Sequence, residues 1–289
     1  MGDIYEGKSR PAHFDGALTV DGSSSLVKLS ATGINGMSRL SSLTLSNGGT
    51  FTDNGPVGGL HSVNAGVVFD GGGTITSEVA GQGGFGNFLF ISGITVTDTA
   101  GLATISADKI SFNYGQTLNV ADSVAGSGTD LLISSSIRNE RPGTITKNGT
   151  GKLTLTGDNV DTSAWTINAG TLLLGAADRL LDAGLLTIDT GGTFDLGGFS
   201  ETVGAVTLTN GTITNGTLTG TSYAVRAGTV SGILAGTGIA VTKTTSGTVT
   251  FSGSNTYSGA TTVSAGTPAT TGDERIADVS AVSVSLGAT

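Results

Sequence analysis

The sequence has no cysteine, and only two histidines, one tryptophan and four prolines among its 289 residues. The lack of cysteine excludes disulfides and thiolate metal sites, and two histidines would need carboxylate ligands to complete a zinc site. Charged residues make up 12% of the chain, against a usual value of about 25%. We therefore expect no metal and no cofactor, and a surface on which hydroxyl groups replace many charges.

Positive charge and long apolar runs are also scarce. With 13 Lys and Arg against 22 Asp and Glu, the net charge is −9, which repels phosphate backbones and argues against a nucleic-acid partner. No stretch approaches about 18 uninterrupted apolar residues, so no membrane span is predicted. The first thirty residues lack a charged segment followed by an apolar one, and we expect either a removed leader or a piece of a longer protein.

Glycine, by contrast, fills 49 positions, and 37% of the residues are hydrophobic, too many for a disordered chain. Gly-Thr dipeptides recur every 17 to 22 residues through the second half of the sequence. They begin at Gly149, Gly170, Gly192, Gly211, Gly228, Gly247 and Gly266. A self-similar period near 20 residues indicates a solenoid.

A longer repeat contains this short one. The stretch Gly151–Thr171 has a near-copy 96 residues downstream, at Gly247–Thr267. Identical pairs at this offset are Lys147 and Lys243, Gly157 and Gly253, Asn159 and Asn255, Arg179 and Arg275, Asp182 and Asp278, and Thr193 and Thr289. We expect the repeat to keep what the interior and the corners of each coil require, and the chain to stop in mid-repeat.

Between the glycines lie short runs that alternate apolar and polar residues. "KLTLTG" places Leu153 and Leu155 on one face and Thr154 on the other. Such strict alternation over about five residues predicts a half-buried strand. The Asn-Gly pairs that end many runs suit hairpins as well as corners, but the regular period favours corners.

These observations predict an all-β parallel β-helix of about 13 coils, each of roughly 20 residues. One coil cannot bury its own apolar face, whereas stacked coils pair in parallel about 4.8 Å apart and share an interior. We divide the chain into residues 1–15, a cap or arm, residues 16–146, divergent coils, and residues 147–289, coils with the 96-residue repeat.

The segments "GKLTLTGDNV", "TINAGTLLLG" and "GTVTFSGSNTYSGATTVSAGT" resemble autotransporter-associated β-strand repeats, over about Lys147 to Thr289. This family occurs in large secreted bacterial surface proteins. The resemblance implies a right-handed parallel β-helix, located extracellularly or on the bacterial cell surface, as a stalk or passenger. The family carries no common catalytic residues, so none is transferred. Pro268, where the first copy has Leu172, departs from the pattern and would mark a corner or a fraying coil.

Neither histidine suggests a catalytic or metal site. His13 and His61 lie in dissimilar contexts, away from any G-x-S-x-G motif, and we interpret both as surface or loop residues. The run Gly83–Gly86 superficially resembles a glycine-rich calcium loop, but it is followed by Asn87 and is not tandem. Turn glycines explain it better.

Carboxylates offer the only enzymatic alternative, because parallel β-helices also carry polysaccharide lyases and glycosidases, which need clustered acids. The candidates are Asp182, Asp189 and Asp195, and Asp122 with Asp130. However, Arg179 and Asp182 recur as Arg275 and Asp278, and an active site is not normally duplicated. We therefore interpret the pair as a corner ion pair and predict no catalytic residue.

Aromatic and threonine residues receive structural interpretations. The cluster of Phe69, Phe85, Phe88, Phe90 and Phe112 predicts a core stack rather than an exposed carbohydrate-binding patch, and Trp165 is interpreted as a residue that packs at a corner. Threonine rows could match ice or a crystalline polysaccharide if they stacked in register. The spacings between Thr154, Thr207, Thr212, Thr217 and Thr248 are irregular, which favours ordinary outward-facing threonines.

The sequence thus predicts a non-catalytic structural or adhesive solenoid, either a rigid stalk or a subunit of an end-to-end fibre. Expected partners are a second copy or a continuation of the chain, and a glycan or other cell-surface ligand. The alternative is a polysaccharide-binding or polysaccharide-degrading β-helix.

Overall fold

The computed structural model describes residues 16–29, 38–55, 61–81, 86–123, 128–138, 141, 143–158, 164–272, 275–276, 279–285 and 287–288. The predicted cap at residues 1–15, with His13, lies outside this set, as do Phe85, Asn159 and Asp278. The described residues contain strands, turns and bends, and among them no helix is long and apolar enough to cross a membrane. The chain divides into two compact units, Met1–Asp161 and Thr162–Thr289.

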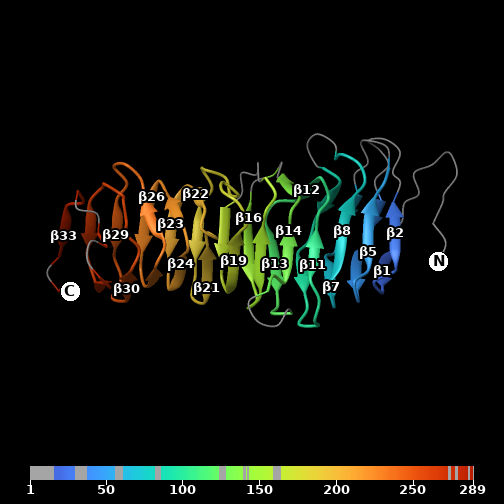
Figure 1. Cartoon of the computed structure of the whole chain (residues 1–289), viewed down its shortest axis with the longest axis horizontal. Helices are drawn as coiled ribbons and strands as arrows, with labels where there is room; N and C mark the ends of the chain where they lie inside the picture. Colours follow the sequence, from blue (N-terminus) through green and yellow to red (C-terminus); the bar gives the residue numbers. More distant parts are fainter. Residues whose placement is uncertain are drawn as a thin grey trace. The chain divides into compact units, whose positions relative to one another are not determined.

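The first unit is built from three parallel sheets, and each coil contributes one strand to the first sheet and one to the second (Figure 1). The first sheet holds β1 (Ala17–Asp21), β4 (Ser42–Ser46), β7 (Val67–Asp70), β10 (Ile94–Val96), β13 (Gln116–Val120) and β16 (Thr144–Asn148). The second holds β2 (Leu26–Leu29), β5 (Thr50–Asp53), β8 (Gly73–Ser77), β11 (Ala103–Ile105), β14 (Leu131–Ile133) and β17 (Lys152–Leu155). The third holds β3 (Ser38–Leu40), β6 (His61–Val63), β9 (Phe88–Phe90), β12 (Lys109–Phe112) and β15 (Ser136–Arg138).

The second unit repeats this architecture. Its first sheet holds β18 (Ala164–Ile167), β20 (Leu186–Ile188), β23 (Ala205–Leu208), β26 (Ser222–Val225), β29 (Val241–Lys243), β31 (Thr261–Val263) and β33 (Val282–Val284). Its second holds β19 (Gly170–Leu174), β21 (Gly192–Asp195), β24 (Gly211–Thr214), β27 (Gly228–Val230), β30 (Thr248–Phe251) and β32 (Thr267–Thr270). Its third holds β22 (Ser200–Thr202), β25 (Thr217–Thr219) and β28 (Ile233–Ala235).

The parallel β-helix predicted from the sequence is confirmed. Strands of successive coils pair in parallel, as β1 does with β4 and β19 with β21. Within the described residues, the first sheet has six strands in the first unit and seven in the second, matching the predicted number of coils. The alternation also holds, because inner positions such as Leu172, Phe194, Ile213 and Val230 are buried.

Register places threonines in one outward column, which the sequence analysis did not predict. Thr171, Thr193, Thr212, Thr229 and Thr250 are consecutive partners in the second sheet of the second unit, and all are half-buried. The threonines compared in the sequence lie in three different sheets, so their irregular spacing did not reveal this column. Coils differ in length at their corners, so equal register does not need equal spacing in sequence. The outward orientation was correct.

The described members of the phenylalanine cluster pack in the interior, as predicted. Phe69, Phe88, Phe90 and Phe112 are at most 1% exposed. The Phe90 ring lies 6.3 Å from Phe88 and 5.9 Å from Phe112, measured between centroids.

Trp165 is also buried, as predicted, but it lies within β18 rather than at a corner. It shares an inner column of the first sheet with Tyr223 and Thr261. The hydroxyl groups of Tyr257 and Thr261 are 2.8 Å apart. Trp165 and Thr261, which are 96 residues apart, therefore occupy the same inner position in their coils.

The repeated lysines point inward and hold backbone carbonyls at the following corner. Lys147 Nζ donates to the carbonyl oxygens of Asn148 (3.1 Å) and Gly149 (2.8 Å). Lys243 Nζ donates to those of Thr245 and Ala265 (3.1 Å for Ala265). Burial lowers the pKa of both lysines. The pKa of Lys147 falls to about 8, although the negative charge of Asp130 acts to raise it. The repeat keeps lysine there because its ammonium group reaches carbonyls that no aliphatic side chain could satisfy.

Pro268 lies inside β32, paired with Val249 of β30, rather than at a corner. The predicted corner was therefore wrong. β32 is the last described strand of its sheet, and an edge strand tolerates a residue without an N–H group.

Candidate functional site: a polar corner and groove in the first unit

Buried polar side chains gather where the second sheet of the first unit turns into the third. Asp53, at the end of β5, is fully buried and accepts hydrogen bonds from the Gly55 amide (3.0 Å) and from Asn87 Nδ2 (2.9 Å). The Nε2 atom of His61 lies 3.2 Å from its Oδ1. Burial opposes ionisation of Asp53, but these contacts outweigh it and hold its pKa below the ordinary value. Asp53 is therefore a buried carboxylate anion.

His61 contradicts its prediction as a surface or loop residue. It is wholly buried at the start of β6, and its ring centroid lies 5.6 Å from that of Phe88. The carboxylate of Asp53 stabilises a histidine in this interior position. Nothing in the local sequence links the two residues, because they meet only after the chain turns between the sheets.

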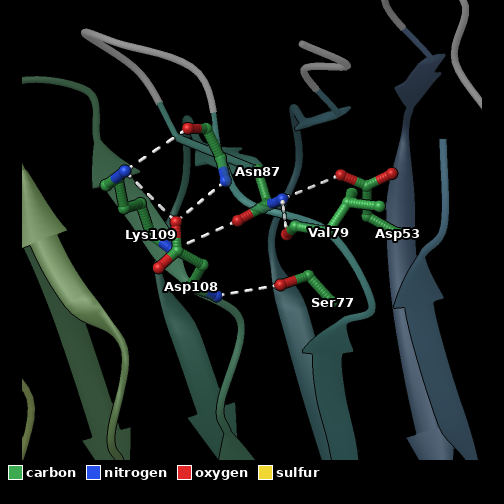
Figure 2. Close-up of polar contacts among 7 residues, drawn as sticks. Asp53, Ser77, Val79, Asn87, Asp108 and Lys109 are labelled. Atoms are coloured by element: carbon green, nitrogen blue, oxygen red, sulfur yellow. Dashed lines mark hydrogen bonds and ion pairs between the residues drawn. The ribbon is translucent and has the colours of Figure 1, made fainter. Parts of the chain in front are cut away.

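Asn87 joins three coils through one side chain (Figure 2). Its Nδ2 donates to Asp53 and to the carbonyl oxygen of Val79 (3.2 Å), while its Oδ1 accepts from the Lys109 amide (3.1 Å). Asn255 does the same in the second unit, since its Oδ1 accepts from the Leu234 amide (2.8 Å) and its Nδ2 donates to the Arg275 carbonyl (2.6 Å). A corner asparagine thus links neighbouring coils through hydrogen bonds of its side chain.

The polar corner continues outward to Asp108 and Lys109 (Figure 2). Asp108 Oδ2 accepts from the Gly81 amide (2.9 Å) and lies 3.2 Å from Lys109 Nζ, and the Asp108 amide donates to Ser77 Oγ (2.9 Å). Partial burial opposes ionisation, but the Gly81 amide and Lys109 outweigh it and lower the pKa of Asp108. Asp108 is a fixed, ionised acceptor facing solvent.

A hollow of about 490 Å³ opens beside this pair. Its lining comes from three successive coils: Asp108, Lys109, Ser134, Ser136, Arg138, Thr156, Gly157 and Asp158. We call it the corner groove. Seven of these eight residues carry a polar side chain. The groove could not be predicted from the sequence, because its four charged residues come from three separate stretches of the chain and meet only where three coils stack.

The carboxylates singled out from the sequence do not form a cluster. Asp182 is exposed, Asp189 follows β20 of the first sheet, and Asp195 ends β21 of the second sheet. Asp195 Oδ1 accepts from the Gly197 amide (2.9 Å) and from Asn215 Nδ2 (3.1 Å), so it stabilises a turn.

Asp122 and Asp130 also differ in environment. Asp122 is exposed, whereas Asp130 is buried and accepts from the Ser123 and Lys152 amides. Among the described residues, no group of three or more His, Asp or Glu side chains could hold a metal ion.

Arg179 does not form the predicted corner ion pair with Asp182. Its Nε donates to the Ala177 carbonyl oxygen (2.8 Å), and the ion pairs between described residues are Lys28–Glu78, His61–Asp53 and Lys109–Asp108. Arg275 Nε likewise donates to the Thr271 carbonyl (3.0 Å). The repeated arginine therefore holds the backbone of its corner.

Glu201, which the sequence analysis did not single out, is buried beneath the same segment. Its carboxyl group accepts from the amides of Arg179 (2.7 Å) and Leu180 (3.1 Å). Burial raises the pKa of Glu201 to about 7, and the charges of Asp178 and Asp182 add to this effect, against the two amides. Glu201 is thus partly protonated near neutral pH.

We expect the free energy of unfolding to fall as the pH rises from 4.5 to 7, because of Glu201. In this range folded Glu201 keeps a proton that the unfolded chain releases, so stability falls as pH rises. The shift from 4.5 to about 7 corresponds to about 3 kcal/mol. Urea unfolding of wild type and Glu201→Gln across this range measures the effect. The slope should flatten in Glu201→Gln but not in the exposed control Glu78→Gln, and equal slopes in all three would contradict the assignment.

Comparison with known proteins bears on the repeat rather than on the groove. The passenger-associated-transport-repeat family matches residues 145–174 and 241–267. These two segments are similar to passenger repeats. They contain β16, β17, β18 and β19 in one copy and β29, β30 and β31 in the other, which confirms the resemblance found in the sequence. Such repeats point to an autotransporter passenger, a secreted or surface-exposed protein. Searches of curated proteins and of solved structures gave no match.

Proposed function

We propose that the chain is a non-catalytic structural solenoid, the stalk of an extracellular passenger on a bacterial cell surface. The observation that carries this proposal is the 96-residue repeat, in which Lys243, Gly253 and Asn255 each maintain contacts within or between coils. A segment in which repeated residues such as these three serve stacking suits a scaffold. In support, two of the five acidic residues that suggested an enzyme, Asp130 and Asp195, accept hydrogen bonds from backbone amides.

A panel of neutral and acidic polysaccharides incubated with the purified chain tests the non-catalytic part. We expect no new reducing ends and no unsaturated products. Depolymerisation that is lost on changing Asp108 or Asp158 to Asn would overturn it and favour the degrading alternative.

We further propose that coils stack end to end beyond β33, with a longer chain or a second copy. Val282 and Val284 are each 53% exposed, yet they continue the inner columns of Thr261 and Val263. Inner positions left in water favour addition of another coil. Light scattering over a wide concentration range should show growing assemblies, or the native protein should exceed 28.4 kDa. A monomer at every concentration, together with a native mass equal to that of this chain, would contradict the proposal.

A further inference from the structure

The described lining residues of the corner groove carry charges that cancel. Lys109 and Arg138 face the same hollow as Asp108 and Asp158, and the hydroxyl groups of Ser134, Ser136 and Thr156 complete it. The lining therefore offers cationic donors, anionic acceptors and groups that can do both. This balance differs from the chain as a whole, which carries a net charge of −9.

The lining is held by paired backbone rather than by free loops. The Ser134 amide donates to the Ile105 carbonyl (2.9 Å), and the Thr156 amide donates to the Ile133 carbonyl (3.0 Å). Ser136 of β15 is the register partner of Lys109 of β12. Since successive coils rise by about 4.8 Å, groups from three coils form a short, fixed row. Preorganised polar groups lose little entropy when they bind a ligand.

We propose that the corner groove binds a short neutral saccharide. An anionic ligand would meet Asp108 and Asp158, a cationic one would meet Lys109 and Arg138, and an apolar one would remove polar groups from water without pairing them. Sugar hydroxyls both donate and accept hydrogen bonds, so they match this mixed lining. The volume of 490 Å³ falls within the range of about 300 to 1,000 Å³ typical of small-ligand sites. Stalk function does not require this site, so the inference goes beyond the proposed function.

The binding is expected to be weak at a single site. Among the described residues that line the groove there is no aromatic side chain, and therefore none that would supply the stacking that strengthens many sugar complexes. Dissociation constants on the order of 1 mM are expected.

The test is a titration of the full chain, labelled with ¹⁵N, with neutral trisaccharides of glucose, mannose, xylose and N-acetylglucosamine. At least one should shift the amide signals of residues 134–138 and 156–158. Arg138→Gln and Ser136→Trp, the first removing a donor and the second filling the hollow, should each weaken binding about tenfold. Arg226→Gln, an exposed arginine in the second unit, should leave it unchanged.

Two measurements make the outcome decisive. Thermal unfolding must show that both variants are folded. If Ser136→Trp is not folded, the test uses Arg138→Gln alone. A trisaccharide of uronic acid is titrated in parallel. Tighter binding of the acidic sugar than of its neutral analogue would overturn the neutral class, and the absence of shifts in the groove with every sugar would overturn the site.

Discussion

Replacing Gly253 with alanine is expected to lower the free energy of unfolding by about 3 kcal/mol. A Cβ atom at this position would lie 2.0 Å from the Gly232 carbonyl oxygen and 2.7 Å from its carbon. Both are backbone atoms of the preceding coil, so they cannot rotate aside as a side chain could. The coils would have to separate locally, which weakens their parallel pairing. Denaturant unfolding followed by far-ultraviolet circular dichroism measures the loss.

A second glycine separates this steric effect from backbone strain. Gly238 has a φ of +73° with nothing within 4 Å of an added Cβ, so Gly238→Ala reports the strain alone, about 1 kcal/mol. Gly157, the repeat equivalent of Gly253, would place a Cβ 2.0 Å from the Ser135 carbonyl oxygen and should behave like Gly253. If Gly253→Ala costs no more than Gly238→Ala, close approach of coils does not explain the repeated glycine.

The strands could be predicted because their signals are local. Alternation in runs such as Leu153–Leu155, and the short period of Gly-Thr dipeptides, both reflect a single coil. Register could not be read in the same way. Coil lengths vary, so the column from Thr171 to Thr250 becomes visible only when the pairs of strands are known. The sequence therefore predicted the kind of fold better than the arrangement of its outer face.

The polar corner could not be predicted from the sequence, for a related reason. Asp53, His61 and Asn87 are unremarkable residues in their local contexts, and the carboxylate explains the histidine only when the two are in contact. Asn255 gave the one usable signal, because the repeat conserves asparagine at Asn159. That conservation within the chain predicted a corner, but not that the side chain would bind the coils on both sides.

Changing Asn87 to leucine is expected to destabilise the protein by about 3 to 5 kcal/mol. Leucine has a similar size but no polar atoms, so the Asp53 carboxylate, the Val79 carbonyl and the Lys109 amide each lose a partner. The loss at Asp53 dominates because a buried anion that loses one of its donors is costly. Denaturant unfolding at neutral pH measures the change. Asn119→Leu, an exposed asparagine of β13, should stay within about 0.5 kcal/mol of wild type.

The pH dependence distinguishes a lost anion contact from poor packing. The folded-state pKa of Asp53 lies below 3.8, so its contribution is present above pH 3.8 and is lost as pH falls through the folded value. Removing the Asn87 donor raises that pKa, because hydrogen bonds to the charged form no longer favour it. The difference in stability between wild type and Asn87→Leu should therefore narrow on acidification. If the difference in stability between wild type and Asn87→Leu stays constant down to the acid transition, leucine merely packs badly, and the Asn87 side chain does not stabilise the buried carboxylate.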